Sequence, residues 1–367
     1  MRLSNYIPKV VDALILKGFD TLEFGLKIES YESALRPYLD KFKKLKEEAH
    51  ESGIEKSIFI NDLFLTVHRT GKRLYPYRLS CDDYTIFFAD KELKTNPPVF
   101  VHFYSGYIWS YGLDDAYQKF IEWFKYITEA VYSNQVSRAD LCADTDKAVF
   151  REIDFKGIVT RAQKKDMYPD SLHLNGRKFS GFTVGKGSPI SARIYNKTLE
   201  IKRSGKEWFK KIWHEYGWIE MKEVWRVEFQ LRREVLKEFS INTIEDLLEK
   251  ENGLWAYLTQ DWLTIRQPSQ DNVSRWRIKR KWRIIQEGGL NYMASPLTRD
   301  LVKEGNMMQL LSQGSGLLLS IAAVGNHSSL DETTRLFQSW AEIGLTKKNT
   351  SFQKEKERRR KKYLLTD

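Results

Sequence analysis

The strictest pattern in the chain is the alternation of residues 225–232, WRVEFQLR, in which every second residue is apolar. A period of two places successive side chains on opposite faces of a β-strand. The four apolar residues would enter a core, while Arg226, Glu228 and Arg232 share the opposite face. The segment therefore predicts a strand of a sheet that has one buried and one polar face.

Two other segments repeat this arrangement. Residues 136–144, VSRADLCAD, place Arg138, Asp140 and Asp144 on one side of a strand. If the strands share a sheet, these carboxylates lie on one surface with Glu228. Carboxylates of this kind suit a hard divalent cation such as Mg²⁺ or Mn²⁺.

The third segment, residues 192–200 (ARIYNKTLE), places Arg193, Tyr195 and Lys197 on one strand face. A tyrosine has an ordinary pKa near ~10, so it is a poor nucleophile at neutral pH unless positive charge or a base favours its anion. Two flanking cations supply such charge. The alternative interpretation is a structural tyrosine at a sheet edge with solvated basic neighbours.

Together these segments resemble a known family, the replication initiators of staphylococcal-type rolling-circle plasmids. Its relatives are the relaxases of Gram-positive conjugative elements and some phage initiators. The order and spacing of the motifs match that family over roughly residues 20–265. The motifs are R-x-D-L-x-x-D from Arg138 to Asp144, GFTVGKGS from Gly181 to Ser188, RIYNK-x-x-E from Arg193 to Glu200 and WRVEF-x-LR from Trp225 to Arg232.

The resemblance implies a role for each of these side chains. Tyr195 matches the DNA-nicking nucleophile, and Asp140 and Glu228 match positions expected to bind a divalent metal, Mg²⁺ or Mn²⁺. Asp144 is a weaker candidate ligand. The remaining catalytic candidates are cations that would clamp the phosphate and stabilise a pentacovalent transition state, namely Arg193, Lys197 and Arg226.

The charge of the chain favours a polyanionic partner. It has 60 Lys and Arg against 49 Asp and Glu, a net charge of +11 and a pI near 9.3. Cations alternate with tryptophans at residues 275–283, a segment that predicts either a DNA contact or a solvated basic face. The candidate DNA-contacting residues are Arg138, Lys186, Arg232, Arg275, Trp276, Arg277, Arg280 and Lys281.

Other chemistries find less support in the sequence. The Gly181-x-x-x-Gly185-Lys186 segment is one residue short of a Walker loop, which favours a plain hairpin over nucleotide hydrolysis. The six histidines form no His-x-His pair, so the two-histidine metal motif of other rolling-circle nucleases is missing. No Arg…His-x-x-Arg…Tyr set of a tyrosine recombinase is present.

We expect an α+β fold: an antiparallel nicking sheet with helices packed on one face, plus a smaller helical C-terminal region. The expected domains are residues 1–266 and a basic region at 267–367. Apolar spacing predicts a helix over 114–131, and a second helix is expected near 155–165. Strands at 182–184 and 191–197 should form a hairpin.

The expected function is site-specific, metal-dependent nicking of one DNA strand through a 5′-phosphotyrosyl intermediate, which initiates rolling-circle replication or conjugative transfer. The alternative is a DNA-binding regulator or structural module of the same fold that does not cleave. Expected partners are an origin with a single-stranded or hairpin nick site, a host helicase and polymerase, and a second copy of the chain. Two isolated cysteines and no recognisable signal peptide favour the cytoplasm, and no membrane association is expected.

Overall fold

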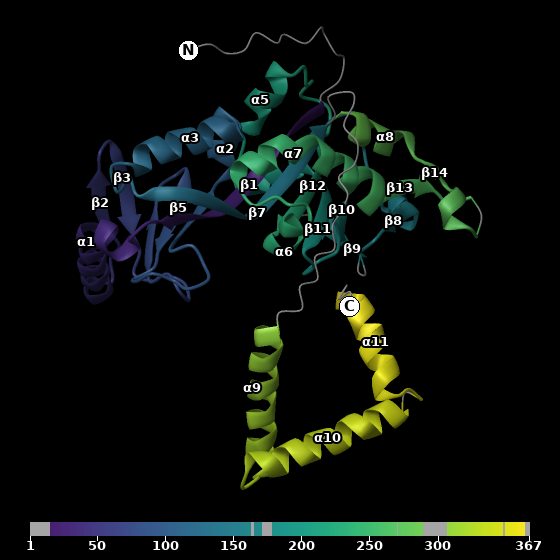
Figure 1. Ribbon diagram of the computed structural model, residues 1–367. Coiled ribbons are helices and arrows are strands. Elements are labelled where there is room, and N and C mark those ends of the chain that lie inside the picture. The colour runs from purple at the N-terminus through teal and green to yellow at the C-terminus, as the bar shows by residue number, and fades with distance from the viewer. Residues whose placement is uncertain are drawn as a thin grey trace. The chain divides into compact units, whose positions relative to one another are not determined.

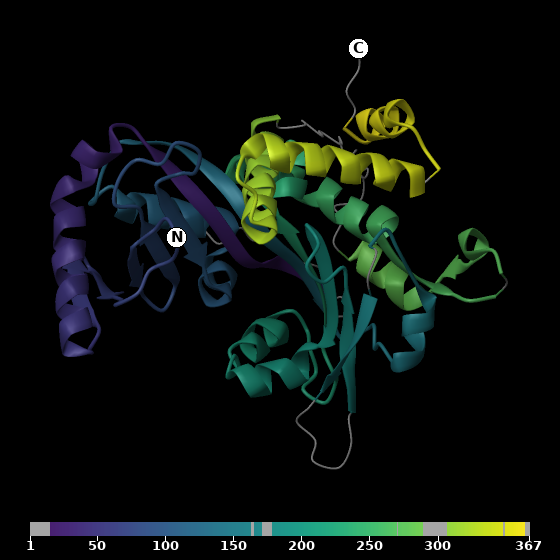
Figure 2. The ribbon, with the colours of Figure 1, turned by 90° about the horizontal axis from the view of Figure 1, so that it is seen from below.

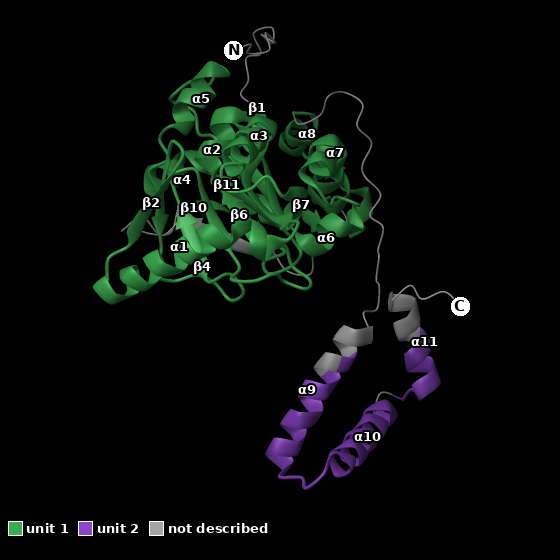
Figure 3. Cartoon of the chain, turned by 60° about the vertical axis from the view of Figure 1, so that its left-hand side comes forward, with its two compact units in different colours: residues 1–298 green, residues 299–367 purple. Residues whose placement is uncertain are grey.

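The structure is a computed structural model that describes residues 15–162, 165–170, 178–269, 271–288, 307–347 and 349–363. The chain divides into two compact units, Met1–Thr298 and Arg299–Asp367 (Figure 3). The sequence places the boundary after residue 266 instead. The difference arises because Trp282 and Ile285, which lie beyond that point, are fully buried in the core of the first unit.

Within the described residues, eleven strands form one antiparallel sheet, and the expected α+β class is confirmed (Figure 1). The three segments with charged faces are direct neighbours in its order, as β7, β12 and β11. In spatial order the strands are β2 (Lys56–Ile60), β3 (Leu63–Val67), β4 (Tyr77–Ser80), β5 (Tyr84–Phe88), β6 (Val99–Phe103), β1 (Ile15–Ile28), β7 (Val131–Thr145), β12 (Trp225–Arg232), β11 (Ile190–Asn196), β10 (Lys178–Val184) and β9 (Lys165–Asp170).

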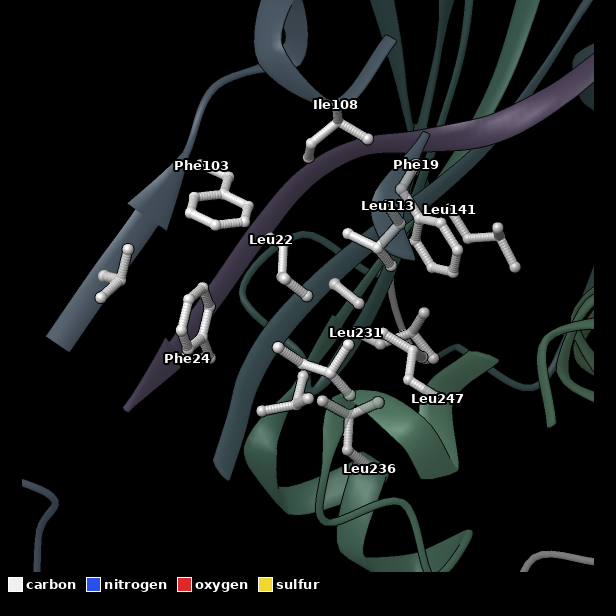
Figure 4. Packing of buried hydrophobic residues seen from close by; sticks show 14 of the residues in the cluster. Phe19, Leu22, Phe24, Phe103, Ile108, Leu113, Leu141, Leu231, Leu236 and Leu247 are labelled. Atoms are coloured by element: carbon white, nitrogen blue, oxygen red, sulfur yellow. The ribbon is translucent and has the colours of Figure 1, made fainter. Parts of the chain in front are cut away.

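One face of this sheet carries the main hydrophobic core. Apolar side chains of β1, β7 and β12 meet those of the covering helices, as Leu22, Leu141, Leu231 and Leu247 do in Figure 4. Helix α7 (Ile244–Ala256), which carries Leu247, begins at a capping box, in which the Thr243 hydroxyl accepts a hydrogen bond from the backbone of residue 246. The helices that contribute to this core are α1 (Tyr31–Ser52), α2 (Ser105–Tyr111), α3 (Leu113–Phe124), α6 (Arg233–Glu238), α7 (Ile244–Ala256) and α8 (Arg280–Glu287).

The opposite, polar face is partly covered by a second and smaller cluster. Helices α4 (Lys197–Ser204) and α5 (Phe209–Glu215) contribute Ile201, Phe209 and Trp213 to it. In Figure 2 these helices and α7 lie on opposite sides of the sheet. Helices α4 and α5 therefore cover one end of the polar face, next to Tyr195.

Some expected elements differ from those observed. The helix expected over 114–131 is α3, which ends at Phe124. The Ile127 amide donates to the Phe124 carbonyl in a turn there, and Val131 begins β7. The helix expected near 155–165 is wrong: a 3₁₀ turn at Glu152–Gly157 leads into β8 (Ile158–Thr160). That strand pairs with β13 (Leu263–Gln267) in a second sheet, and β13 pairs with β14 (Arg277–Ile278). The expected hairpin of residues 182–184 and 191–197 is confirmed as β10 and β11.

The second unit consists, in its described part, of α9 (Met307–Gly325), α10 (Leu330–Lys347) and α11 (Phe352–Tyr363). Many of its apolar side chains are exposed, among them Val324 and Trp340. No helix of the described residues is long and apolar enough to cross a membrane.

Candidate active site

Strand register brings the charged side chains together on the polar face of the first unit. Across β11 and β12, Arg193 stands opposite Glu228 and Tyr195 opposite Arg226. Across β12 and β7, Arg226 stands opposite Asp144. The expectation that the three strands share one surface is therefore confirmed by the pairing.

At the centre of this surface, the Tyr195 hydroxyl donates a hydrogen bond to Glu228 Oε2 at 2.8 Å. The other carboxylate oxygen of Glu228 accepts a hydrogen bond from the Arg193 guanidinium. Burial, and then the Glu228 charge, raise the pKa of Tyr195 well above its ordinary value. In this state the tyrosine is a neutral phenol whose proton points at a carboxylate.

A second ion pair lies beneath helices α4 and α5. Arg226 is fully buried, and its Nη2 lies 2.8 Å from Asp144 Oδ2, while Nε binds the other oxygen. The Trp213 indole also donates to Asp144 Oδ2, at 2.9 Å. These contacts occupy both Asp144 oxygens, so the structure corrects two expectations: Asp144 is not free to bind a metal, and Arg226 is not exposed to a phosphate.

The remaining partner of Arg226 is Asp20, which sequence reasoning missed. Thr21 pairs with Asp140 and Phe19 with Leu141, so Asp20 is the extra residue of a β-bulge in β1. The bulge turns both Asp20 and Thr21 towards the polar face, whereas a regular strand would bury one of them. Burial opposes ionisation, but Arg226 and then Lys197 lower the pKa of Asp20 to about 2.

The fourth acidic group is Asp140, which is buried beside Arg138. The Arg138 Nε donates to Asp140 Oδ1 at 2.8 Å, and Nη1 contacts Glu23 Oε1 at 3.2 Å. Burial, opposed by Arg138 and reinforced by the charge of Glu228, raises the pKa of Asp140 to about 7. Asp140 and Glu228 are thus close enough for each charge to act on the other.

This pair offers a limited fit to a divalent cation. Among the described residues, no three His, Cys, Asp or Glu side chains are grouped so that they could hold a metal ion. Mg²⁺ is commonly held by only one or two carboxylates, with water and substrate phosphate completing its shell. Asp140 and Glu228 supply two hard oxygen donors of that kind, and each carboxylate would have to share its oxygens with an arginine.

Next to Tyr195 lies a pocket of about 210 Å³. Lys197 is buried in its wall, with Nζ 5.6 Å from the Tyr195 ring centroid and 4.7 Å from that of Phe209. Burial, and then Arg226, lower the pKa of Lys197. The other polar side chains that line the pocket are Asp20, Ser180, Thr183, Arg193, Asn196, Glu200, Arg203, Lys206 and Glu228.

Four of these lining residues are cations, and Arg203 and Lys206 were not among the sequence candidates. They follow the tyrosine by eight and eleven residues on or after α4, which starts where Asn196 Oδ1 caps the Leu199 amide. No motif spacing marks them. The sequence offered one signal that could have indicated them, the change from strand to helix directly after Tyr195, which brings the following residues back to the site.

The predicted DNA contacts outside this pocket are only partly available. Lys186, Arg232, Arg275, Arg277 and Arg280 are exposed, and Trp276 is half-buried. In the basic segment, by contrast, Lys281 Nζ lies 2.7 Å from Asp154 Oδ2, and Lys279 binds the other oxygen. That pairing and the burial of Trp282 give this part of the segment a structural role.

Comparison with known proteins adds a likeness of fold. No protein-family model matches the sequence, and no curated protein matches it. Among solved structures, the chain is similar to a rolling circle replication initiator protein from Geobacillus stearothermophilus. The TM-score is 0.46 and the identity 13%, over 78% of this chain and 100% of that chain. The assignment of chemistry to this protein therefore depends on its own residues.

Proposed function

We propose that this protein nicks and rejoins one strand of DNA through Tyr195, and so initiates rolling-circle replication or conjugative transfer. The observation that carries the proposal is the arrangement of Tyr195, Glu228 and Arg193 beside a cation-lined pocket. A hydroxyl, a general base and a phosphate-binding cation are the groups that phosphoryl transfer to tyrosine requires. The motif resemblance over residues 20–265 supports the same proposal.

In the proposed reaction, the Tyr195 oxygen attacks a phosphodiester phosphorus while Glu228 accepts the phenolic proton. A bond forms between the tyrosine oxygen and phosphorus, and the bond from phosphorus to the 3′ oxygen breaks. The leaving oxygen takes up a proton and becomes a free 3′-OH, while the 5′ phosphate stays on Tyr195. A polymerase extends that 3′-OH, and reversal of the step rejoins the strand without a nucleotide cofactor.

The cations around the pocket have distinct parts in this proposal. Arg193 is half-exposed and can turn from Glu228 to the phosphate, where its planar guanidinium would neutralise developing charge. Lys197 lies over the Tyr195 ring and pairs with Glu200, while the charges of Arg226 and then Arg193 favour the phenolate. Arg226 holds β12 against β7 and acts as a positioning residue.

A divalent cation, Mg²⁺ or Mn²⁺, belongs to the proposal at Asp140 and Glu228. When bound there, it would polarise the phosphate. Without positive charge at this point, a phenolate beside the Glu228 carboxylate is strongly disfavoured. The chain's own contribution is to fix both carboxylates on adjacent strands with their oxygens facing the polar side.

A second candidate is a DNA-binding module of the same fold that does not cleave. The burial of Tyr195, which is 9% exposed, favours it, because a nucleophile has to reach its substrate. DNA binding would then depend on the cations of the pocket and of the basic segment alone. The two candidates differ in whether a covalent bond to DNA forms.

The discriminating experiment is nicking of a supercoiled plasmid that carries the element's own origin, with Mn²⁺ or Mg²⁺ present. Tyr195→Phe should bind the origin normally and leave the plasmid closed, because only the hydroxyl is removed. Tyr132→Phe, at a tyrosine that is 64% exposed on β7, is the matched control and should nick as wild type does. Absence of nicking by the wild-type protein on every origin fragment and metal tested would favour the non-cleaving module.

A further inference from the structure

The sheet continues beyond the candidate active site, and its other half has no role in the proposed chemistry. We propose that the polar face of β2 to β6, with the loop at residues 68–76, binds the bases and phosphates of the single-stranded DNA that leads to Tyr195. This inference rests on the proposed function for the identity of its ligand. Three observations support it: the strand pairing, the environment of Lys72, and the exposed ring pair of Phe59 and Phe64.

Strand register makes this face continuous with the site. Phe87 of β5 stands opposite Phe100 of β6, and His102 of β6 stands opposite Glu23 of β1. Glu23 in turn stands opposite Arg138, which contacts Asp140. Four inter-strand steps separate β6 from β11, or about 19 Å at the usual ~4.8 Å spacing.

Lys72 lies on this face and forms no ion pair with a carboxylate of the described residues. Its Nζ lies 3.2 Å from the Phe100 ring centroid, 4.1 Å from that of Phe87 and 5.1 Å from that of Tyr75. Burial lowers the pKa of Lys72 to about 8. A cation held over aromatic rings at the edge of an open face suits a ligand that offers both phosphates and bases.

Further cations surround Lys72. Arg69 and Arg73 are exposed in the same loop, and the buried Arg78 Nε on β4 has no hydrogen-bond partner among the described residues. In the described part of the chain, none of these four cations forms an ion pair with a carboxylate. Glu23, the acidic residue whose charge reaches Lys72, pairs with Arg138 instead. The excess positive charge is complementary to a polyanion.

The loop that carries these cations is held in place. The Lys72 backbone amide donates to the Tyr75 carbonyl at 2.9 Å, and the Tyr75 hydroxyl donates to the Pro97 carbonyl at 2.9 Å. A Cβ on Gly71 would lie 2.2 Å from the Tyr75 carbonyl oxygen, so this position requires glycine. A preformed loop loses little entropy when it binds a ligand.

At the outer end of the face, Phe59 of β2 and Phe64 of β3 form an exposed cross-strand pair. Their side chains are 57% and 69% exposed, and their ring centroids are 4.6 Å apart. Both residues alternate with Ile60 and Leu65, which are buried in the core, so the rings project from the polar face. Unstacked bases of a single strand bind such rings, whereas the stacked bases of a duplex are not available to them.

The test uses the Tyr195→Phe protein, in which binding is read without cleavage. A triple change of Arg69, Lys72 and Arg73 to Gln should weaken binding of a single-stranded origin oligonucleotide at least about tenfold. It should also reduce the salt slope of log K by about two, at roughly 0.7 per lost phosphate contact. The matched control changes three exposed lysines of the helices on the core side of the sheet and should retain wild-type affinity and slope. These lysines are Lys41 and Lys44 of α1 and Lys119 of α3.

A second variant removes rings and keeps charge. Phe59→Ala with Phe64→Ala, at two exposed positions, should weaken binding of the single strand and leave binding of duplex DNA unchanged. Wild-type affinity in both the charge and the ring variant, or equal losses for single strand and duplex, would overturn the inference. In the Tyr195→Phe background, either result is independent of nicking. In otherwise wild-type protein, the charge variant should still cleave a saturating short oligonucleotide that covers only the nick site.

Discussion

Arg226 of β12 and Arg193 of the neighbouring strand β11 give the sharpest prediction, because the structure assigns them different roles. Arg226 and Asp144 both have fully buried side chains and form a hydrogen-bonded pair. Arg226→Met leaves the Asp144 carboxylate in the interior with only the Trp213 indole as a donor. Breaking a buried pair in this way typically costs on the order of 3–5 kcal/mol. For an m-value of ~3 kcal/mol/M, the urea midpoint should fall by about 1 M or more.

The assay is equilibrium urea unfolding of four proteins: wild type, Arg226→Met, Asp144→Asn and the double variant. Because the second change removes the charge stranded by the first, the double variant should lose about 1–3 kcal/mol less than the sum of the single variants. Arg193→Gln is the comparison, since its guanidinium is half-exposed and its loss should cost only about 1 kcal/mol. A midpoint for Arg226→Met within experimental error of that for Arg193→Gln would refute the structural role of Arg226.

Three further predictions concern the metal, the basic segment and the packing behind the nucleophile. Folding raises the pKa of Asp140 from the ordinary 3.8 to about 7, so this residue favours the folded state at low pH and loses that contribution as pH rises through about 7. Mn²⁺ should accordingly bind more weakly as pH falls below about 7, and the Asp140→Asn protein should bind none. Titration calorimetry measures both, and an Mn²⁺ affinity that does not change from pH 5.5 to 8 would contradict this prediction. In the basic segment, Arg277, Arg280 and Arg283 are exposed. Changing all three to glutamine should lower the affinity for duplex DNA and flatten the salt slope of log K by about two to three units. Lys281→Gln should instead lower the stability of the fold and leave that slope unchanged. Gly181→Ala should slow nicking more than it weakens DNA binding, because a Cβ there would lie 2.9 Å from the Tyr195 Cα; an unchanged nicking rate would exclude that contact.

The alternating segments were predictable because a strand with one buried face imposes a period of two on its residues. Trp225 to Arg232 follows this period throughout, and its charged face led to the expectation that it shares one sheet with the tyrosine strand. The hairpin at Gly185 was equally predictable, since its backbone has φ +73, which glycine adopts without strain.

The missed features depend on contacts between distant parts of the chain. The bulge that turns Asp20 towards the polar face is a property of the pairing of β1 with β7, and no local pattern encodes it. The same holds for the contacts between Lys281 and Asp154 and between Arg226 and Asp144. Through them, three predicted ligand-binding residues, Lys281, Arg226 and Asp144, have structural roles instead. From sequence alone, a charged residue on a polar face has the same pattern whether it meets solvent, DNA or another side chain.

The most direct test of the central claim is to map the covalent bond. Wild-type protein is incubated with Mn²⁺ and an oligonucleotide that spans the nick site, digested with a protease, and the peptides that carry nucleotide are sequenced by mass spectrometry. The account predicts one adduct, a 5′-phosphate on Tyr195, which is lost in Tyr195→Phe and in the presence of a chelator. An adduct on another residue, or cleavage that persists in Tyr195→Phe, would contradict it.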